Sequence, residues 1–291
     1  MSPARLAPPQ ESIERALDEA NINDKTPIIE RYGNWLHDVI FEGDFGLSPS
    51  GDSVNRAISS RIGASVKLLA ISTVLSVVVG VSLGVYTAQH QYQWQDRFFS
   101  GMASLFMVIP TVVLAILVVF AAIWINDATG MRLFYVTGLS SYTGFDPIMA
   151  FIDFLQHVFL PSVVLTIVSA VGYHLGQRTY LLDEMNADYV RTARAKGLTR
   201  KKAIRKHALR SSLIPTAVSV AFSIASVFTG AVMTEKVFAI HGMGEYFINC
   251  IGTNDINGAV AVAAFSGVCT LIGALLADLF AAALDPRIKM N

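Results

Sequence analysis

The sequence predicts an all-α integral membrane protein, and three observations carry that prediction. Long apolar runs recur along the 291 residues, charged residues make up only 15% of the chain, and nine of its 22 Lys and Arg residues fall within the stretch 183–210. Soluble domains contain about 25% charged residues, and a helix that spans a bilayer needs about 20 mostly apolar residues. The runs and the low charge therefore favour a membrane protein, and the basic stretch indicates its orientation.

Five apolar runs are long enough to be transmembrane helices. They cover 66–88, 98–125, 157–182, 211–234 and 259–284. Any single run could be a buried helix of a soluble core, but five of this length with Tyr and Trp at their flanks argue against that. Pro110, inside the second run, is interpreted as a proline tolerated within one continuous helix, as membrane helices allow. Gly80 and Gly84 form a four-residue spacing of small residues that predicts a close helix contact.

The distribution of positive charge sets the orientation of the spans. Because Lys and Arg collect on the cytoplasmic side, 183–210 is expected to be a cytoplasmic loop. The short loop 89–97 and the C-terminal tail then also lie inside. The loops 126–156 and 235–258 lie outside, and each holds one Lys or Arg, Arg132 and Lys236.

Five spans place the two ends of the chain on opposite sides. Residues 1–65 are polar and of mixed charge, with no apolar core of the kind a secretion signal needs. They are predicted to be an extracytoplasmic N-terminal segment. A membrane span is expected to come before this segment, ahead of Met1.

The basic stretch has the pattern of a docking element. Residues 184–196 are mostly good helix formers, and Lys196 followed by Gly197 is typical of a helix end that turns through positive φ. Leu198 is placed to close a hydrophobic contact back onto that helix, and Thr199 is a candidate N-cap for a second helix over 200–209. The alternative is a solvated basic loop that attracts anionic lipid headgroups, which needs no glycine-terminated helical elbow.

The chain contains no recognisable catalytic constellation. It has no Gly-Lys-Ser/Thr phosphate-binding loop, no His-Glu-x-x-His and no Gly-x-Ser-x-Gly. Its two cysteines, Cys250 and Cys269, form neither a metal motif nor a disulfide framework. The prediction is a chain that is not an enzyme and binds no cofactor or metal, so that any uphill transport takes its energy from a partner.

Several segments carry a resemblance to a known family. Residues 189–198 (Tyr-Val-Arg-Thr-Ala-Arg-Ala-Lys-Gly-Leu), followed by His-Ala-Leu-Arg at 207–210 and Leu-Ile-Pro at 213–215, closely resemble the cytoplasmic loop of ABC importer permeases. Gly-Asp-Phe-Gly-Leu-Ser at 43–48, Glu-Lys-Val-Phe at 235–238 with Gly-Met-Gly at 242–244, and Leu-Asp-Pro-Arg-Ile at 284–288 are similar to the dipeptide, oligopeptide and nickel branch, in the first of its two paired permeases.

The resemblance implies a type I ABC importer permease fold over 66–288. Family members usually have six transmembrane helices, so the first of the six would precede the five predicted here. The family's Glu-Ala-Ala-x-x-x-Gly motif, anchored on Gly197, places Arg and Thr at its first two positions, as is common in the peptide branch. The loop 183–210 would supply the coupling helix that docks on an ATPase, through Arg191, Thr192, Ala193, Arg194, Ala195, Lys196, Gly197 and Leu198. Supporting positions in the loop would be Tyr189, His207, Leu209 and Pro215.

The function implied by the resemblance is a pore-forming subunit of an importer for di- or oligopeptides in the bacterial inner membrane. Expected partners are a second homologous permease, two ATPase subunits that bind the ATP and Mg, an extracytoplasmic substrate-binding protein and membrane lipid, with no nucleic acid. The same family with nickel or opine cargo is one alternative. A passive channel, an intramembrane enzyme or a membrane scaffold is an alternative of another class.

Overall fold

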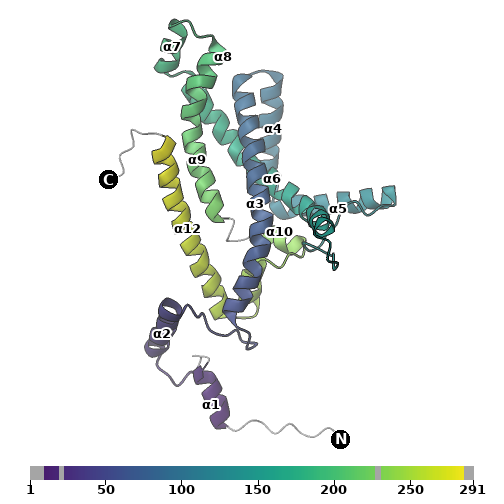
Figure 1. Cartoon of the computed structure of the whole chain (residues 1–291), viewed down its shortest axis with the longest axis vertical. Coiled ribbons are helices and arrows are strands. Elements are labelled where there is room, and N and C mark those ends of the chain that lie inside the picture. Colours follow the sequence, from purple (N-terminus) through teal and green to yellow (C-terminus); the bar gives the residue numbers. More distant parts are fainter. Residues whose placement is uncertain (1–9, 20–22, 227–230, 285–291) are drawn as a thin grey trace. The chain divides into compact units, whose positions relative to one another are not determined.

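A computed structural model describes residues 10–19, 23–226 and 231–284, and the regular elements in these ranges are helices (Figure 1). They are α1 (Gln10–Glu19), α2 (Ile28–His37), the π-helix η1 (Asp38–Glu42), α3 (Val54–Gln89), α4 (Trp94–Val108), α5 (Thr111–Thr129), α6 (Pro147–Met185), α7 (Asp188–Ala195), α8 (Arg200–Ala203), the π-helix η2 (Ile204–Ala208), α9 (Leu209–Ser226), α10 (Val232–Val237), α11 (Met243–Gly252) and α12 (Ile256–Leu284). In the described part, four helices are long and apolar enough to cross a membrane: α3, α5, α6 and α12.

The chain divides into two compact units. One comprises Met1–Ser60 with Phe247–Ala263. Within it, the side chain of Asn257, at the start of α12, donates to the carbonyl of Leu47 at 2.9 Å. The Asn55 side chain likewise donates to the carbonyl of Gly43 at 2.6 Å. These side-chain bonds order the Gly-Asp-Phe-Gly segment, which has little regular backbone structure of its own.

The second unit, Arg61–Tyr246 with Ala264–Asn291, holds the helical bundle that positions the functional site. Its central element is α6, which packs against α4, α5, α9 and α10. Leu114, Val164, Leu165 and Phe238 are among the buried side chains of its main apolar cluster. Because lipid tails are as apolar as these side chains, close packing rather than burial from water holds such helices together.

Gly80 and Gly84 confirm the predicted close helix contact, since they bring α3 directly against α6. A Cβ atom built on Gly80 would lie 2.6 Å from the carbonyl oxygen of Ala170, and one on Gly84 would lie 2.7 Å from that of His174. Thr87, one turn further along α3, lies 3.1 Å from the His174 ring through its hydroxyl. The backbones therefore approach as closely as the four-residue spacing of small residues predicted.

The prediction of one continuous helix over 98–125 is wrong. The structure has two helices there, α4 and α5, which meet at an angle at Pro110 (Figure 1). Ile109 and Pro110 both have extended backbone angles, with ψ of 121° and 137°. Proline lacks the N–H that would continue the helix and disfavours helical angles in the residue before it, which explains the break.

The predicted run 211–234 is also interrupted. Helix α9 is described to Ser226 and includes Pro215, while residues 227–230 of the prediction lie outside the described residues. Ala231 is not helical, with φ −112° and ψ 76°, so its neighbours from Val232 onward belong to the separate short helix α10. The other three predicted runs, 66–88, 157–182 and 259–284, lie inside α3, α6 and α12.

Candidate docking loop and polar cleft

The basic stretch forms a compact helical elbow at one end of α6 and α9. Helix α6 ends at Met185, α7 and α8 follow, and η2 leads into α9 (Figure 1). The predicted helix over 184–196 is in fact two helices, because Asn186 caps α6 and Ala187 is extended with ψ 148°. Asn and Asp favour helix ends over helix interiors, which explains the break in the Asn-Ala-Asp sequence. The predicted helix over 200–209 contains the π-helical turn η2.

The turn at Gly197 has the predicted geometry. Gly197 takes φ +95°, its N–H donates to the carbonyl of Arg194 at 2.9 Å, and the Leu198 N–H donates to the carbonyl of Ala193 at 3.2 Å. These two bonds form the Schellman motif that ends helices through a glycine. The Thr199 side chain then accepts from the Lys202 N–H at 3.4 Å, which confirms the predicted N-cap of the second helix.

The inner face of the elbow is buried against the ends of the long helices. Val190, Ala193, Ala203 and Ala208 share an apolar cluster with Leu181 of α6. Ala88, at the end of α3, belongs to the same cluster, and Leu198 packs on its edge. The hydrophobic contact expected of Leu198 is therefore present, and it anchors the turn to the bundle.

The outer face of the elbow is exposed and strongly basic. All nine Lys and Arg residues of 183–210 are exposed, and Arg191 forms an exposed pair with Asp188 at 3.7 Å. Of the predicted docking residues, six are exposed, namely Arg191, Thr192, Arg194, Ala195, Lys196 and Gly197. The prediction that Ala193 contacts the ATPase is wrong, because this residue is only 9% exposed and faces the chain's own core.

The four supporting positions have different surroundings. Tyr189 donates its hydroxyl to the Glu184 carboxylate, which ties α7 to the end of α6. Leu209 packs on the cluster of the inner face. His207 is half-buried in η2, and Pro215 is an exposed residue inside α9.

A buried ion pair joins α4 to α6 near the predicted cytoplasmic side. Arg178 donates through Nε and Nη2 to the two carboxylate oxygens of Asp96, at 2.7 and 2.9 Å. Asp96 also accepts from the Tyr92 N–H at 2.9 Å and is only 3% exposed. It lies in the predicted loop 89–97, and the hydrogen bonds from Arg178 hold the pKa of its carboxyl at about 2, below the ordinary 3.8. The guanidinium of Arg178 and the carboxylate of Asp96 therefore form a bidentate pair, which fixes α6 against α4.

Two predicted extracytoplasmic segments are ordered by buried carboxylates. In 126–156, Asp153 accepts from the Ser140 hydroxyl at 2.6 Å and the Ser141 N–H at 2.8 Å. In 235–258, Glu235 is fully buried and accepts from the Ser65 hydroxyl at 2.7 Å and the Glu245 N–H at 2.9 Å. The Glu-Lys-Val-Phe motif thus has a structural role. The terminal motif after Leu284 lies outside the described residues.

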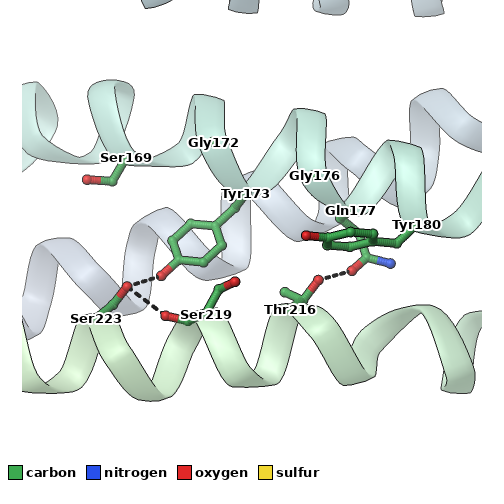
Figure 2. A pocket seen from close by; sticks show the side chains of 9 residues that line it. All are labelled: Ser169, Gly172, Tyr173, Gly176, Gln177, Tyr180, Thr216, Ser219 and Ser223. Carbon is green, nitrogen blue, oxygen red and sulfur yellow. Dashed lines mark hydrogen bonds between the residues drawn. The ribbon is translucent and has the colours of Figure 1, made fainter. Parts of the chain in front are cut away.

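A polar cleft between α6 and α9 was not predicted (Figure 2). It has a volume of about 300 Å³. From α6 it is lined by Ser169, Gly172, Tyr173, Gly176, Gln177 and Tyr180, and from α9 by Thr216, Ser219 and Ser223. A signal was present in the sequence, because both sets recur at spacings of three and four residues, which place them on one face of each helix. Which two helices would pair could not be read from that spacing.

The long apolar helices and the exposed basic elbow define a class, a multi-helix membrane protein with a basic loop at one end of its helices. Comparison with known families is more specific. The chain belongs to the family described as binding-protein-dependent transport system inner membrane component, which matches residues 80–290.

Two similar proteins belong to peptide transport systems. The chain is 40% identical to the oligopeptide transport system permease protein OppB of Mycobacterium tuberculosis (strain ATCC 25618 / H37Rv), over 98% of this chain and 87% of that protein. It is 32% identical to the dipeptide transport system permease protein DppB of Bacillus subtilis, over 97% and 85%. Among solved structures, the MetNI methionine ABC transporter has a similar fold, with a TM-score of 0.58 at 17% identity, over 78% of this chain and 96% of that one.

Proposed function

We propose that this chain is the translocating subunit of an ATP-driven importer for oligopeptides. The cargo is inferred from the similarity to oligopeptide and dipeptide permeases along nearly the whole chain. The chain would pair with a second, homologous permease and receive peptide from an extracytoplasmic binding protein. Two ATPase subunits would bind and hydrolyse the ATP, and this chain would carry out no catalysis.

The observation that carries the docking part of this proposal is the two-faced elbow. Its inner face is buried against α3 and α6, whereas its outer face presents Thr192, Ala195 and Gly197 among exposed basic side chains. Small side chains beside a tight turn allow another protein's groove to approach the backbone closely. The surrounding positive charge suits an acidic rim on the ATPase.

The lining of the polar cleft favours peptide over nickel as the cargo. Nickel prefers imidazole, thiolate and carboxylate ligands. None of the nine lining residues is His, Cys, Asp or Glu. In the described part of the chain, one group of such side chains lies close enough to share an ion, His37, Asp38 and Glu42, and it belongs to the exposed N-terminal segment.

The test is reconstitution of the whole complex in proteoliposomes, with the second permease, the ATPases and the binding protein. The wild-type complex is expected to take up a radiolabelled oligopeptide only when ATP is enclosed in the proteoliposomes, on the side of the ATPases, and binding protein is present outside. A passive channel would instead leak peptide without ATP. A scaffold would bind the ATPases but would show no ATPase stimulation by peptide-loaded binding protein, and either result would overturn the importer function.

Gly197→Val in this complex tests the docking loop. A branched side chain at φ +95° is strained on the order of 1 kcal/mol or more, which corresponds to about a fivefold or greater loss of docking if the docked conformation bears the whole cost. Peptide uptake per complex should fall by about that factor, while Gly197→Asn, which tolerates positive φ better, should retain more uptake. Equal uptake by wild type and Gly197→Val would remove the docking role from this turn.

A further inference from the structure

We propose that the polar cleft between α6 and α9 is a surface along which the backbone of the imported peptide passes. This inference rests on the proposed function, because it assigns a path to the cargo of that importer. The cleft needs an explanation, because hydroxyl and amide groups within transmembrane helices are costly where they face lipid. Their concentration on the facing sides of two helices calls for a polar occupant.

Part of the lining is already satisfied within the chain and forms the walls of the cleft. Gln177 donates to the Ser212 hydroxyl at 2.9 Å and accepts from the Thr216 hydroxyl at 2.5 Å, which joins α6 to α9. The Tyr173 hydroxyl and the Ser223 hydroxyl lie 2.5 Å apart and join the same helices at the other end of the cleft (Figure 2). These bonds fix the spacing of α6 and α9.

Other polar groups of the lining remain open to the cleft. Ser219 is exposed, and its hydroxyl points from α9 toward α6 (Figure 2). That hydroxyl donates to the Pro215 carbonyl of its own helix at 3.1 Å, which leaves its oxygen able to accept a further bond. Ser169 is exposed at the edge of the cleft on α6.

The chemistry of the cleft matches a peptide backbone. Each residue of a peptide other than proline carries one N–H donor and one C=O acceptor, whatever its side chain. The lining offers hydroxyls, one carboxamide and two tyrosine rings, and all nine residues are uncharged. Such a surface can pair with backbone amides and pack on apolar side chains, but it neither attracts nor repels cargo by charge. It suits an importer that accepts peptides of varied sequence.

The extent of the lining also suits an extended chain. From Ser169 to Tyr180, α6 advances by eleven steps, which is about 16 Å along the helix axis. An extended peptide of about five residues has the same length. Gly172 and Gly176 keep the middle of this track free of side chains, and a Cβ atom built on Gly172 meets nothing within 4 Å. A side chain added at Gly172 would therefore enter open space.

The experiment fills the cleft without disturbing its walls. Gly172→Leu is compared with Gly101→Leu. Gly101 is also an exposed helical glycine whose added Cβ meets nothing within 4 Å, but it lies in α4, away from the lining of the cleft. Both are reconstituted with the partner subunits, and uptake of a pentapeptide is normalised to assembled complex. Gly172→Leu should lower uptake about tenfold or more, and Gly101→Leu should leave it close to the wild-type rate. Equal uptake by the two variants would overturn the cleft as a passage.

A second measurement decides the matter if Gly172→Leu does not assemble. In a Cys250→Ser, Cys269→Ser background, Ser219→Cys is alkylated with a small maleimide during turnover. Peptide-loaded binding protein with ATP should slow that alkylation severalfold, whereas Thr179→Cys, exposed on α6 outside the lining, should react at an unchanged rate. No protection at position 219 would contradict the proposal. Failure of the wild-type complex to import any peptide would instead contradict the proposed function, which keeps the two failures distinct.

Discussion

At the scale of single residues, the Asp96–Arg178 pair is the contact whose loss should be most costly. Both carboxylate oxygens are engaged, and Asp96 is almost completely buried. Removing one member of a buried pair leaves the other charge without compensation, which typically costs about 3 kcal/mol or more. The pair therefore matters more to stability than the many exposed charges of the docking loop.

We expect Asp96→Asn to lower the free energy of unfolding by about 3 kcal/mol, measured by denaturant titration in mixed micelles. Because the folded-state pKa of Asp96 is lowered to about 2, its contribution is fully present above its ordinary value of 3.8 and is lost as the pH falls toward 2. The variant and the wild type should thus differ at neutral pH and converge in acid. Asp188→Asn, which removes the carboxylate of an exposed pair, is the matched control and should have no measurable effect. A loss no larger than that of the control would contradict this account of the pair.

At the scale of helices, the contact between α3 and α6 depends on two glycines. Gly84→Leu would place a side chain against the carbonyl of His174 and the backbone N–H of Arg178, which cannot yield as a flexible side chain can. We expect at least a fivefold loss of folded chain, measured by size-exclusion chromatography of a fluorescent fusion, because overpacking costs about 1–3 kcal/mol or more. Gly63→Leu, in the same helix but with nothing within 4 Å of its added Cβ, should preserve the yield. Similar yields from the two variants would show that the helices do not need this close approach.

Local chemistry explains which helical features could be predicted from the sequence. Gly197 and Thr199 specify their turn and cap through their own backbone and side chain, so the elbow was predictable. The break at Pro110 follows from the same local chemistry, but the tolerance of proline in membrane helices allowed the opposite interpretation. Pro161 and Pro215, which do lie inside α6 and α9, show that the sequence alone does not decide between the two outcomes.

Tertiary packing explains what could not be predicted. Ala193 belongs to a helix whose period identifies an apolar face, but the period does not tell whether that face meets the chain's own core or a partner. The polar cleft depends on α6 pairing with α9, which are separated by the whole docking loop. From the sequence alone, Gln177 could equally be a lone polar residue on a span. Its bonds to Ser212 and Thr216 exist only because α6 packs on α9.

At the scale of the whole molecule, the distribution of charge predicts which segments face each side of the membrane. Lys201 lies in the basic elbow and is exposed, whereas Phe145 is fully exposed in 126–156, which holds a single Lys or Arg. In a background without Cys250 and Cys269, Phe145→Cys should react with a membrane-impermeant maleimide in intact cells. Lys201→Cys should react at least tenfold faster in inverted vesicles than in intact cells. The reverse pattern would invert the orientation and exclude docking of a cytoplasmic ATPase at the elbow.

The burial of the elbow's inner face has a mechanical consequence. Val190 and Ala203 share one apolar cluster with Leu181 and Ala88, at the ends of α6 and α3. A force on the outer face can therefore bend the elbow by itself only if it separates the side chains of that cluster. A displacement imposed on the elbow is therefore expected to move the ends of two long helices together. Stiffness at this joint, rather than flexibility, would allow a motor outside the membrane to do work within it.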